Sequence, residues 1–170
     1  HDTSNLSIEN AHRTDLGAFL QAETVVLPIL RLSAGLRGDR VATRNTGGYF
    51  GDRATSNGAF SGFAAGTVGP LSGLSLTAQV SRGFRDPALS DRYFRGPSGR
   101  GFITGNPDLE PETSLQFDLS ARYTLARTQI GVFYYDYRID DLIERYSTQT
   151  DFFFFRNRGE GHISGFEIET

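Results

Sequence analysis

The stretch Thr113-Ser-Leu-Gln-Phe-Asp-Leu-Ser-Ala-Arg-Tyr123 decides the fold class of this chain. Apolar or aromatic side chains at every second position alternate with polar ones, so a β-strand formed here has one apolar face and one polar face. The segment also has roughly the 9–11 residues that a tilted strand needs to cross a bilayer. It therefore predicts one strand of an antiparallel transmembrane β-barrel whose apolar face contacts lipid.

The same alternation recurs along the chain and predicts about seven strands. Besides 113–123, we expect strands at 14–24, 30–37, 58–68, 74–81 and 128–139, and a last strand that begins near His162. Short turns are expected at Pro28, at 69–73 and at Ala126. Long loops are expected over 41–57, over 86–112, and in a third segment that holds Tyr146 and Phe152 to Phe155.

The connections alternate between short and long, as in outer-membrane barrels with short periplasmic turns and long extracellular loops. This pattern places Pro28, Pro70 and Ala126 at the periplasmic rim. It places the loops around Tyr49, Tyr93 and Phe153 outside. Single-chain bacterial barrels have an even number of strands, from about 8 upward. We therefore expect the chain to be a piece of a larger barrel. A soluble antiparallel β domain is the alternative, but its strands average only about 5–6 residues.

Composition narrows the possible functions. The net charge is -3, and without a block of one sign it indicates no nucleic-acid partner. The chain has no cysteine, which excludes disulfides, thiolate metal sites and cysteine nucleophiles. Its 17 lysine and arginine residues are all arginine. Two interpretations are open: genomic codon bias, which we favour, and bidentate binding of phosphate or carboxylate groups, for which arginine is better suited than lysine.

The sequence contains no catalytic or metal-binding pattern. His1, His12 and His162 lie far apart and outside any metal-ligand spacing. No serine occupies a nucleophile-elbow pattern, and Asp140-Asp141 is better explained as a solvated strand end than as an acid–base pair. We therefore expect no enzymatic activity, no cofactor and no resident metal.

Four short motifs resemble those of the TonB-dependent outer-membrane receptors. Ser81-Arg82-Gly83-Phe84-Arg85-Asp86-Pro87 is similar to their S-x-G-F-R-x-P motif, and Asn106-Pro107-Asp108-Leu109-Glu110-Pro111-Glu112 is similar to their NPxLxPE motif. Phe133-Tyr134-Tyr135 with Ile139-Asp140-Asp141-Leu142-Ile143 resembles the strand that follows, and Asn157-Arg158-Gly159-Glu160 with Gly165-Phe166-Glu167-Ile168-Glu169 resembles the last motif. The motifs occur in the family's order and cover most of 81–169.

The first two motifs also have a physical interpretation. Pro87 and Pro107 lack a backbone donor and so suit strand ends, whereas Asn106 suits a turn. We interpret both motifs as architecture of the extracellular rim rather than as ligand sites. The residues concerned are Phe84, Arg85, Pro87, Asn106, Pro107, Leu109, Pro111 and Glu112.

The resemblance implies a barrel of about 22 strands plugged by an N-terminal globular domain. Residues 1–170 would be part of this barrel, without the plug, the TonB-box segment and the closing strand. Such receptors lie in the bacterial outer membrane among its lipids and bind a scarce nutrient, such as a ferric siderophore, haem, cobalamin or a glycan. Their partner TonB acts through the plug and drives import with the proton-motive force.

Candidate ligand-binding residues lie in the loop between the first two motifs. Arginine and tyrosine side chains there can bind an anionic siderophore or a phosphate-bearing ligand, although a solvated loop is the alternative. The candidates are Arg92, Tyr93, Arg95 and Arg100. Haem receptors of the family carry a histidine between these motifs. This chain has none between Pro87 and Asn106, which disfavours haem.

Three further interpretations remain open. Arg82 lies at the outer end of its strand on the apolar face, where pairing with lipid phosphates is an alternative to ligand binding. A passive porin or a barrel adhesin is the alternative function, although porins lack this series of motifs. An outer-membrane enzyme would need a site at the barrel rim, for which His162 is the only candidate.

Overall fold

The computed structural model describes residues 7–170, which form one nine-stranded sheet and one short helix. Seven of the strands are long: β1 (Ala11–Leu27), β2 (Leu30–Gly47), β3 (Gly51–Leu71), β4 (Leu74–Arg85), β7 (Glu112–Leu125), β8 (Thr128–Gln149) and β9 (Phe152–Glu169). The helix α1 (Leu89–Tyr93) and the short strands β5 (Arg95–Ser98) and β6 (Gly101–Thr104) lie between β4 and β7.

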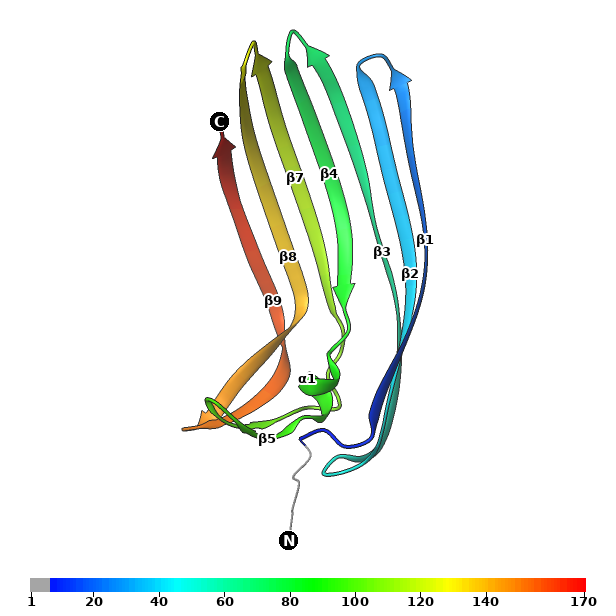
Figure 1. The fold of residues 1–170 in the computed structure, drawn as a ribbon, viewed down its shortest axis with the longest axis vertical. Helices are drawn as coiled ribbons and strands as arrows, with labels where there is room; N and C mark the ends of the chain where they lie inside the picture. Colours follow the sequence, from blue (N-terminus) through cyan, green and yellow to red (C-terminus); the bar gives the residue numbers. More distant parts are fainter. Residues whose placement is uncertain (1–6) are drawn as a thin grey trace.

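The long strands stand side by side as a curved, open sheet in the order β1-β2-β3-β4-β7-β8-β9, each antiparallel to its neighbour (Figure 1). The three tight turns β1–β2, β3–β4 and β7–β8 lie together at one end, which we call the turn end. The segment with α1, β5 and β6 lies at the opposite end, the loop end, where β6 pairs in parallel with β9. The three connections that the sequence predicts as short therefore lie at one rim.

One face of the sheet, which we call the outer face, carries an apolar band. Leu115, Phe117 and Leu119 of β7 point to it and are 41–50% exposed. Cross-strand partners share a face, so the register extends the band over Val80 of β4 and Tyr134 of β8. Within residues 7–170, the buried apolar core consists only of Val41, Tyr93 and Leu109. The apolar side chains thus lie outside rather than in a core, as in a wall that faces lipid.

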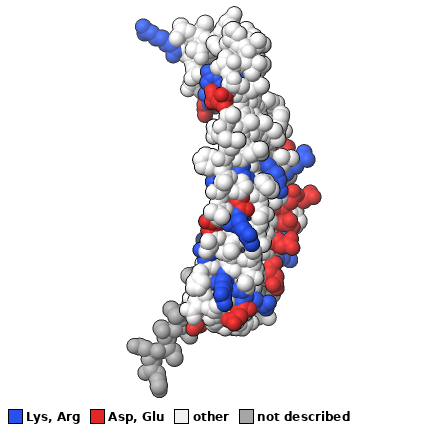
Figure 2. Space-filling model, turned by 90° about the vertical axis from the view of Figure 1, so that its right-hand side faces the viewer, with Lys and Arg blue, Asp and Glu red and all other residues white. Residues whose placement is uncertain are grey.

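The opposite, inner face is polar and carries several ion pairs. Arg37 and Asp39 approach to 2.7 Å, and Arg31 and Glu23 to 3.0 Å. Figure 2, which looks at the sheet from its side, shows that charged side chains of both signs gather mainly in the lower part, toward the loop end. The polar inner face and the apolar outer face confirm the alternation that the sequence predicts.

The expected long loop at 41–57 is wrong, because β2 and β3 continue as a paired hairpin to Gly47 and Gly51. Alternate side chains of β2, namely Val41, Thr43 and Asn45, are buried here. The Asn45 side chain donates hydrogen bonds to the carbonyls of Gly47 and Gly51 at 2.9 and 2.7 Å, which holds the tip of the hairpin. The glycine and asparagine content of this segment therefore serves a tight turn rather than a loop.

The expected loop around Phe152 to Phe155 is wrong for the same reason. β8 continues to Gln149, and β9 begins at Phe152 after a two-residue turn. The pairing of Tyr146 with Phe154 shows that the aromatic residues belong to a strand, which matches their β propensity. The loop between β4 and β7 is thus the only long irregular connection within residues 7–170.

The remaining turns agree with the sequence analysis, whereas β1 extends beyond the predicted 14–24 to Ala11–Leu27 and the last strand begins at Phe152 rather than near His162. The turns at Pro28 and Ala126 are present, and β7 covers the predicted segment 113–123. The turn in 69–73 is shorter than expected, because β3 continues to Leu71. Within residues 7–170, no helix is long and apolar enough to span a membrane.

Candidate functional site

The four motifs meet at the loop end of the sheet. Arg85, the last residue of β4, lies opposite Glu112, the first residue of β7. The Arg85 guanidinium donates two hydrogen bonds to the Glu112 carboxylate at 2.5 and 2.9 Å, a bidentate arrangement that fixes both groups. The same carboxylate accepts a hydrogen bond from the Ile143 backbone N–H at 2.6 Å. Glu112 thus joins β4, β7 and β8.

The electrostatics of Glu112 agree with this role. Burial alone would raise the pKa of its carboxyl group, because the charged form loses water. The hydrogen bonds from Arg85 and from Ile143 N–H, together with the Arg85 charge, outweigh burial and hold the pKa below its usual value. The pairing therefore contributes stability that is present above the ordinary glutamate pKa and is lost as the pH falls through the lowered value.

Asparagine side chains connect the second motif to β8 and β9. The Asn157 amide donates to the Glu110 carbonyl at 2.9 Å and accepts from the Glu110 N–H at 2.8 Å, as a neighbouring strand would. It also donates to the Asp141 carbonyl at 2.7 Å. Asn106 donates to the Phe155 carbonyl at 3.2 Å, while its side-chain oxygen accepts from the Asp108 N–H at 3.0 Å. Members of all four motifs therefore hold one another in place.

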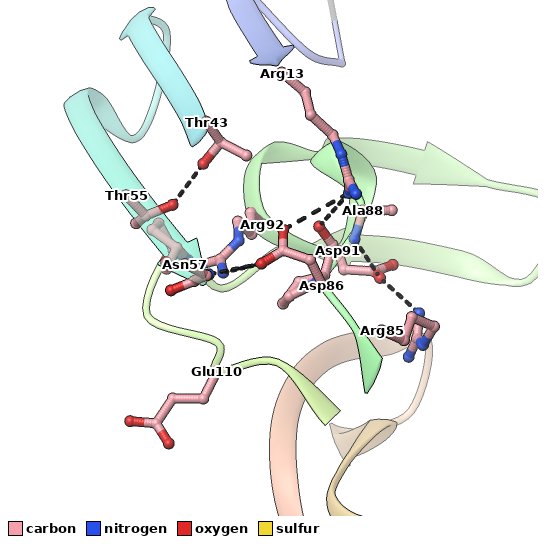
Figure 3. A network of polar contacts seen from close by, with 12 residues as sticks. Arg13, Thr43, Thr55, Asn57, Arg85, Asp86, Ala88, Asp91, Arg92 and Glu110 are labelled. Atoms are coloured by element: carbon pink, nitrogen blue, oxygen red, sulfur yellow. Dashed lines mark hydrogen bonds and ion pairs between the residues drawn. The ribbon is translucent and has the colours of Figure 1, made fainter. Parts of the chain in front are cut away.

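A buried carboxylate attaches the loop to β1 and β3 (Figure 3). The Asp86 side chain is fully buried and accepts a hydrogen bond from the Asn57 amide of β3 at 2.6 Å. Its other oxygen lies 3.6 Å from the Arg13 guanidinium of β1, and Arg92 of α1 approaches to 3.8 Å. Arg13 also donates to the Pro87 carbonyl at 3.2 Å. Two arginines thus surround one buried acid.

The helix α1 places Arg92 and Tyr93 inside the loop. Arg92 is 1% and Tyr93 is 2% exposed. The Arg92 guanidinium donates to the Pro107 carbonyl at 2.7 Å, which ties the first motif region to the second. Gly105 packs directly against the Arg92 backbone. A Cβ at position 105 would lie only 2.7 Å from that backbone. The loop is therefore a packed unit rather than a solvated segment.

A mixed aromatic and arginine surface covers the outside of this unit. The Arg95 guanidinium carbon lies 4.0 Å from the centre of the Tyr49 ring and 5.3 Å from that of Phe102. The Phe102 ring lies 6.1 Å from Phe152. We call these four residues the aromatic–arginine surface. They come from the β2–β3 hairpin, the loop and the β8–β9 hairpin, and they combine cation–π contacts with the exposed rings of Tyr49 and Phe152.

The structure separates the four predicted ligand residues into two groups. Arg92 and Tyr93 are buried, so they support the loop from within, whereas Arg95 and Arg100 are exposed. Tyr49, Phe102 and Phe152 join Arg95, although no local sequence signal indicates that these segments meet. Arg13 and Asn57 bond to Pro87 and Asp86 of the first motif, and no local sequence pattern indicates these contacts either.

The candidate for an enzymatic site has another explanation. His162 Nε2 lies 2.7 Å from Asp136, which also pairs with Arg138 at 3.2 Å. The cross-strand register places these residues on the outer face beside the apolar band. In the part of the chain that the structure describes, no cluster of three or more His, Cys, Asp or Glu side chains is placed to hold a metal ion.

The apolar outer face, the polar inner face and the long antiparallel strands define a wall segment of an outer-membrane β-barrel. The chain belongs to the TonB-dependent receptor family. A family model described as "TonB dependent receptor-like, beta-barrel" matches residues 2–170. The protein is accordingly located in the bacterial outer membrane.

Known outer-membrane proteins resemble this chain in sequence or in fold. The iron-regulated outer membrane virulence protein of Vibrio cholerae is 32% identical over 126 residues, which cover 72% of this chain and 18% of that protein. The Serratia marcescens hemophore receptor HasR, solved with its hemophore HasA and heme, has a TM-score of 0.80 at 18% identity, covering 92% of this chain and 31% of that one. The copper transporter OprC has a TM-score of 0.79 at 20% identity, covering 95% and 26%.

The sequence relative and the solved structures support different conclusions about this chain. The Vibrio relative is named as an outer-membrane protein, HasR as a receptor and OprC as a transporter, and the two solved structures show the fold of this chain alone. The chain spans less than a fifth of the length of the Vibrio protein. Haem in one neighbour and copper in another illustrate that one barrel fold serves different ligands.

Proposed function

We propose that this chain is part of the barrel of a receptor that imports a scarce nutrient across the outer membrane, driven by TonB and the proton-motive force. The complete receptor has further strands and a plug domain, through which TonB acts. The observation that carries this proposal is the convergence of the four family motifs in one network around Glu112 and Asn157. In this proposal the network is architecture that holds the extracellular rim.

A ferric siderophore is the ligand that we favour. The Vibrio relative is named as an iron-regulated protein, and the HasR structure contains heme. The loop 86–111 of this chain has no histidine to ligate haem iron. The aromatic–arginine surface instead offers a cation and stacking faces, which suit an anionic ligand with planar groups. Arg95 and Arg100 are the exposed charges that would contact it.

Uptake of labelled ferric siderophores and cobalamin by cells that express the complete receptor tests the proposal, with and without TonB. We expect uptake to disappear without TonB. Replacing Arg95 by alanine should weaken ligand binding to these cells about tenfold, which corresponds to one desolvated cation–π or charged contact. Arg127→Ala is the matched control, because Arg127 lies in the turn at the other end of the sheet.

The two measurements separate two kinds of failure. Uptake that persists without TonB would overturn the receptor function and favour a passive pore. TonB-dependent uptake with unchanged binding in the Arg95 variant would retain the receptor and reject the aromatic–arginine surface as the ligand site.

A further inference from the structure

Two arginines on the outer face stand directly beyond the apolar band. On β4 the outward side chains run through Leu76 and Val80 to Arg82, and on β2 they run through Leu32 and Leu36 to Arg40. Each arginine is the first charged residue on its strand when the outer face is followed from the turn end. Both therefore lie at the boundary between the hydrocarbon layer and the headgroups on the loop side.

Among residues 7–170, neither arginine has an acidic partner. Arg40 donates to the Ser56 hydroxyl at 3.2 Å and Arg82 to the Phe60 carbonyl, but within residues 7–170 neither forms an ion pair. At the same edge of the band on β8 and β9, by contrast, Asp136 pairs with both Arg138 and His162. The unneutralised positive charge on this edge is thus concentrated on β2 and β4.

Apolar grooves lie beside the two arginines. Phe60 of β3 stands between them, is 77% exposed and forms a wall of both grooves. The groove on the Arg40 side has a volume of about 790 Å³ and includes Leu16 and Gly58. The groove on the Arg82 side has a volume of about 320 Å³ and is lined almost wholly by apolar atoms. An apolar groove that ends at an arginine without a carboxylate partner in the described residues matches an acyl chain with an anionic headgroup.

We propose that this region of the outer face is a specific binding site for a phosphate-bearing acyl lipid of the outer leaflet. The acyl chains lie in the grooves on the two sides of Phe60, and the phosphate groups accept hydrogen bonds from Arg40 and Arg82. Guanidinium groups suit this task because they bind phosphate oxygens in bidentate fashion and extend from apolar surface to headgroup. The site is independent of the nutrient and of TonB.

The test compares two probes on the purified complete receptor: diphosphorylated lipid A and the same lipid without phosphates, in phosphatidylcholine nanodiscs. Bound lipid is measured by native mass spectrometry. We expect the wild-type receptor to prefer the phosphorylated lipid by about 10- to 30-fold, as two arginines near a charged surface provide. The double variant Arg40→Gln/Arg82→Gln should lose this preference, whereas Arg127→Gln at the turn end should keep it.

A second variant tests the grooves without changing charge. Gly58 lies opposite Arg40, and a Cβ there would meet only the Asp39 carbonyl, at an ordinary 3.8 Å. Gly58→Phe should therefore fold, fill the larger groove and weaken both lipids. Equal retention of the two lipids by the wild-type receptor, or an unchanged preference in the double variant, would overturn the site. Displacement of the lipid by millimolar inorganic phosphate would also overturn it, by showing a site for free anions.

Discussion

Replacing Leu119 by arginine is expected to prevent most of the receptor from assembling in the membrane. Leu119 lies at the centre of the outward series on β7, between Phe117 and Ala121. A charged side chain on the lipid face costs about 2–4 kcal/mol at the middle of the bilayer and about 0–1 kcal/mol near its surfaces. The amount of heat-modifiable, folded receptor in outer-membrane fractions measures the effect.

The neighbouring residue supplies the control. Ser120 lies on the inner face, where its strand neighbours Asp118 and Arg122 are polar. Ser120→Arg makes a larger side chain with the same charge one position away, so it should assemble close to the wild-type level. An equal loss of folded receptor in the two variants would mean that the volume or charge of the new side chain, rather than its contact with lipid, limits assembly.

Replacing Asp86 by alanine is expected to release the loop from the sheet. The change leaves Arg92 buried without its acid and removes the acceptor of Asn57. Removing one partner of a buried ion pair costs about 3–5 kcal/mol, because the remaining charge stays desolvated. The side chains of Arg95 and Arg100 are already exposed, and the released backbone around them can then enter the active site of trypsin added to intact cells. We expect cleavage in the loop to accelerate about a hundredfold or more, since this cost lowers the free energy of local opening, which controls cleavage.

Asp108→Ala is the matched control for this experiment. Asp108 belongs to the same loop but is exposed, and its side chain has no ion-pair partner within the described residues. Cleavage should therefore remain at the wild-type rate. Acceleration in the Asp108 variant equal to that in the Asp86 variant would show that the buried carboxylate does not hold the loop.

The sequence was most informative where one physical rule dominates. Alternation from Leu115 to Tyr123 identified β7 and its lipid face, because a strand has only two faces and the bilayer accepts one. The order of the four motifs indicated the family. It also led to Arg85 and Glu112, whose pairing the structure then showed.

Other features depend on contacts between distant segments. Asn45 and the glycines near it indicated a loop, but Asn45 is buried, and its hydrogen bonds across the tip hold the segment in a hairpin. Arg92 and Tyr93 looked like exposed ligand residues, yet the helix turns them inward. Tyr49 and Arg95 are far apart in sequence, and only the packing of the loop against the tip of the β2–β3 hairpin brings them together.

The alternation of lipid contact along β7 tests the account most directly. The chain has no cysteine, so single cysteines can be placed at each position from 115 to 122 and labelled with a small fluorophore. The labelled receptor is then reconstituted in bilayers of brominated lipid. We predict strong quenching at 115, 117, 119 and 121 and weak quenching at 116, 118, 120 and 122. Quenching that does not alternate, or that is absent at every position, would contradict a membrane-spanning wall.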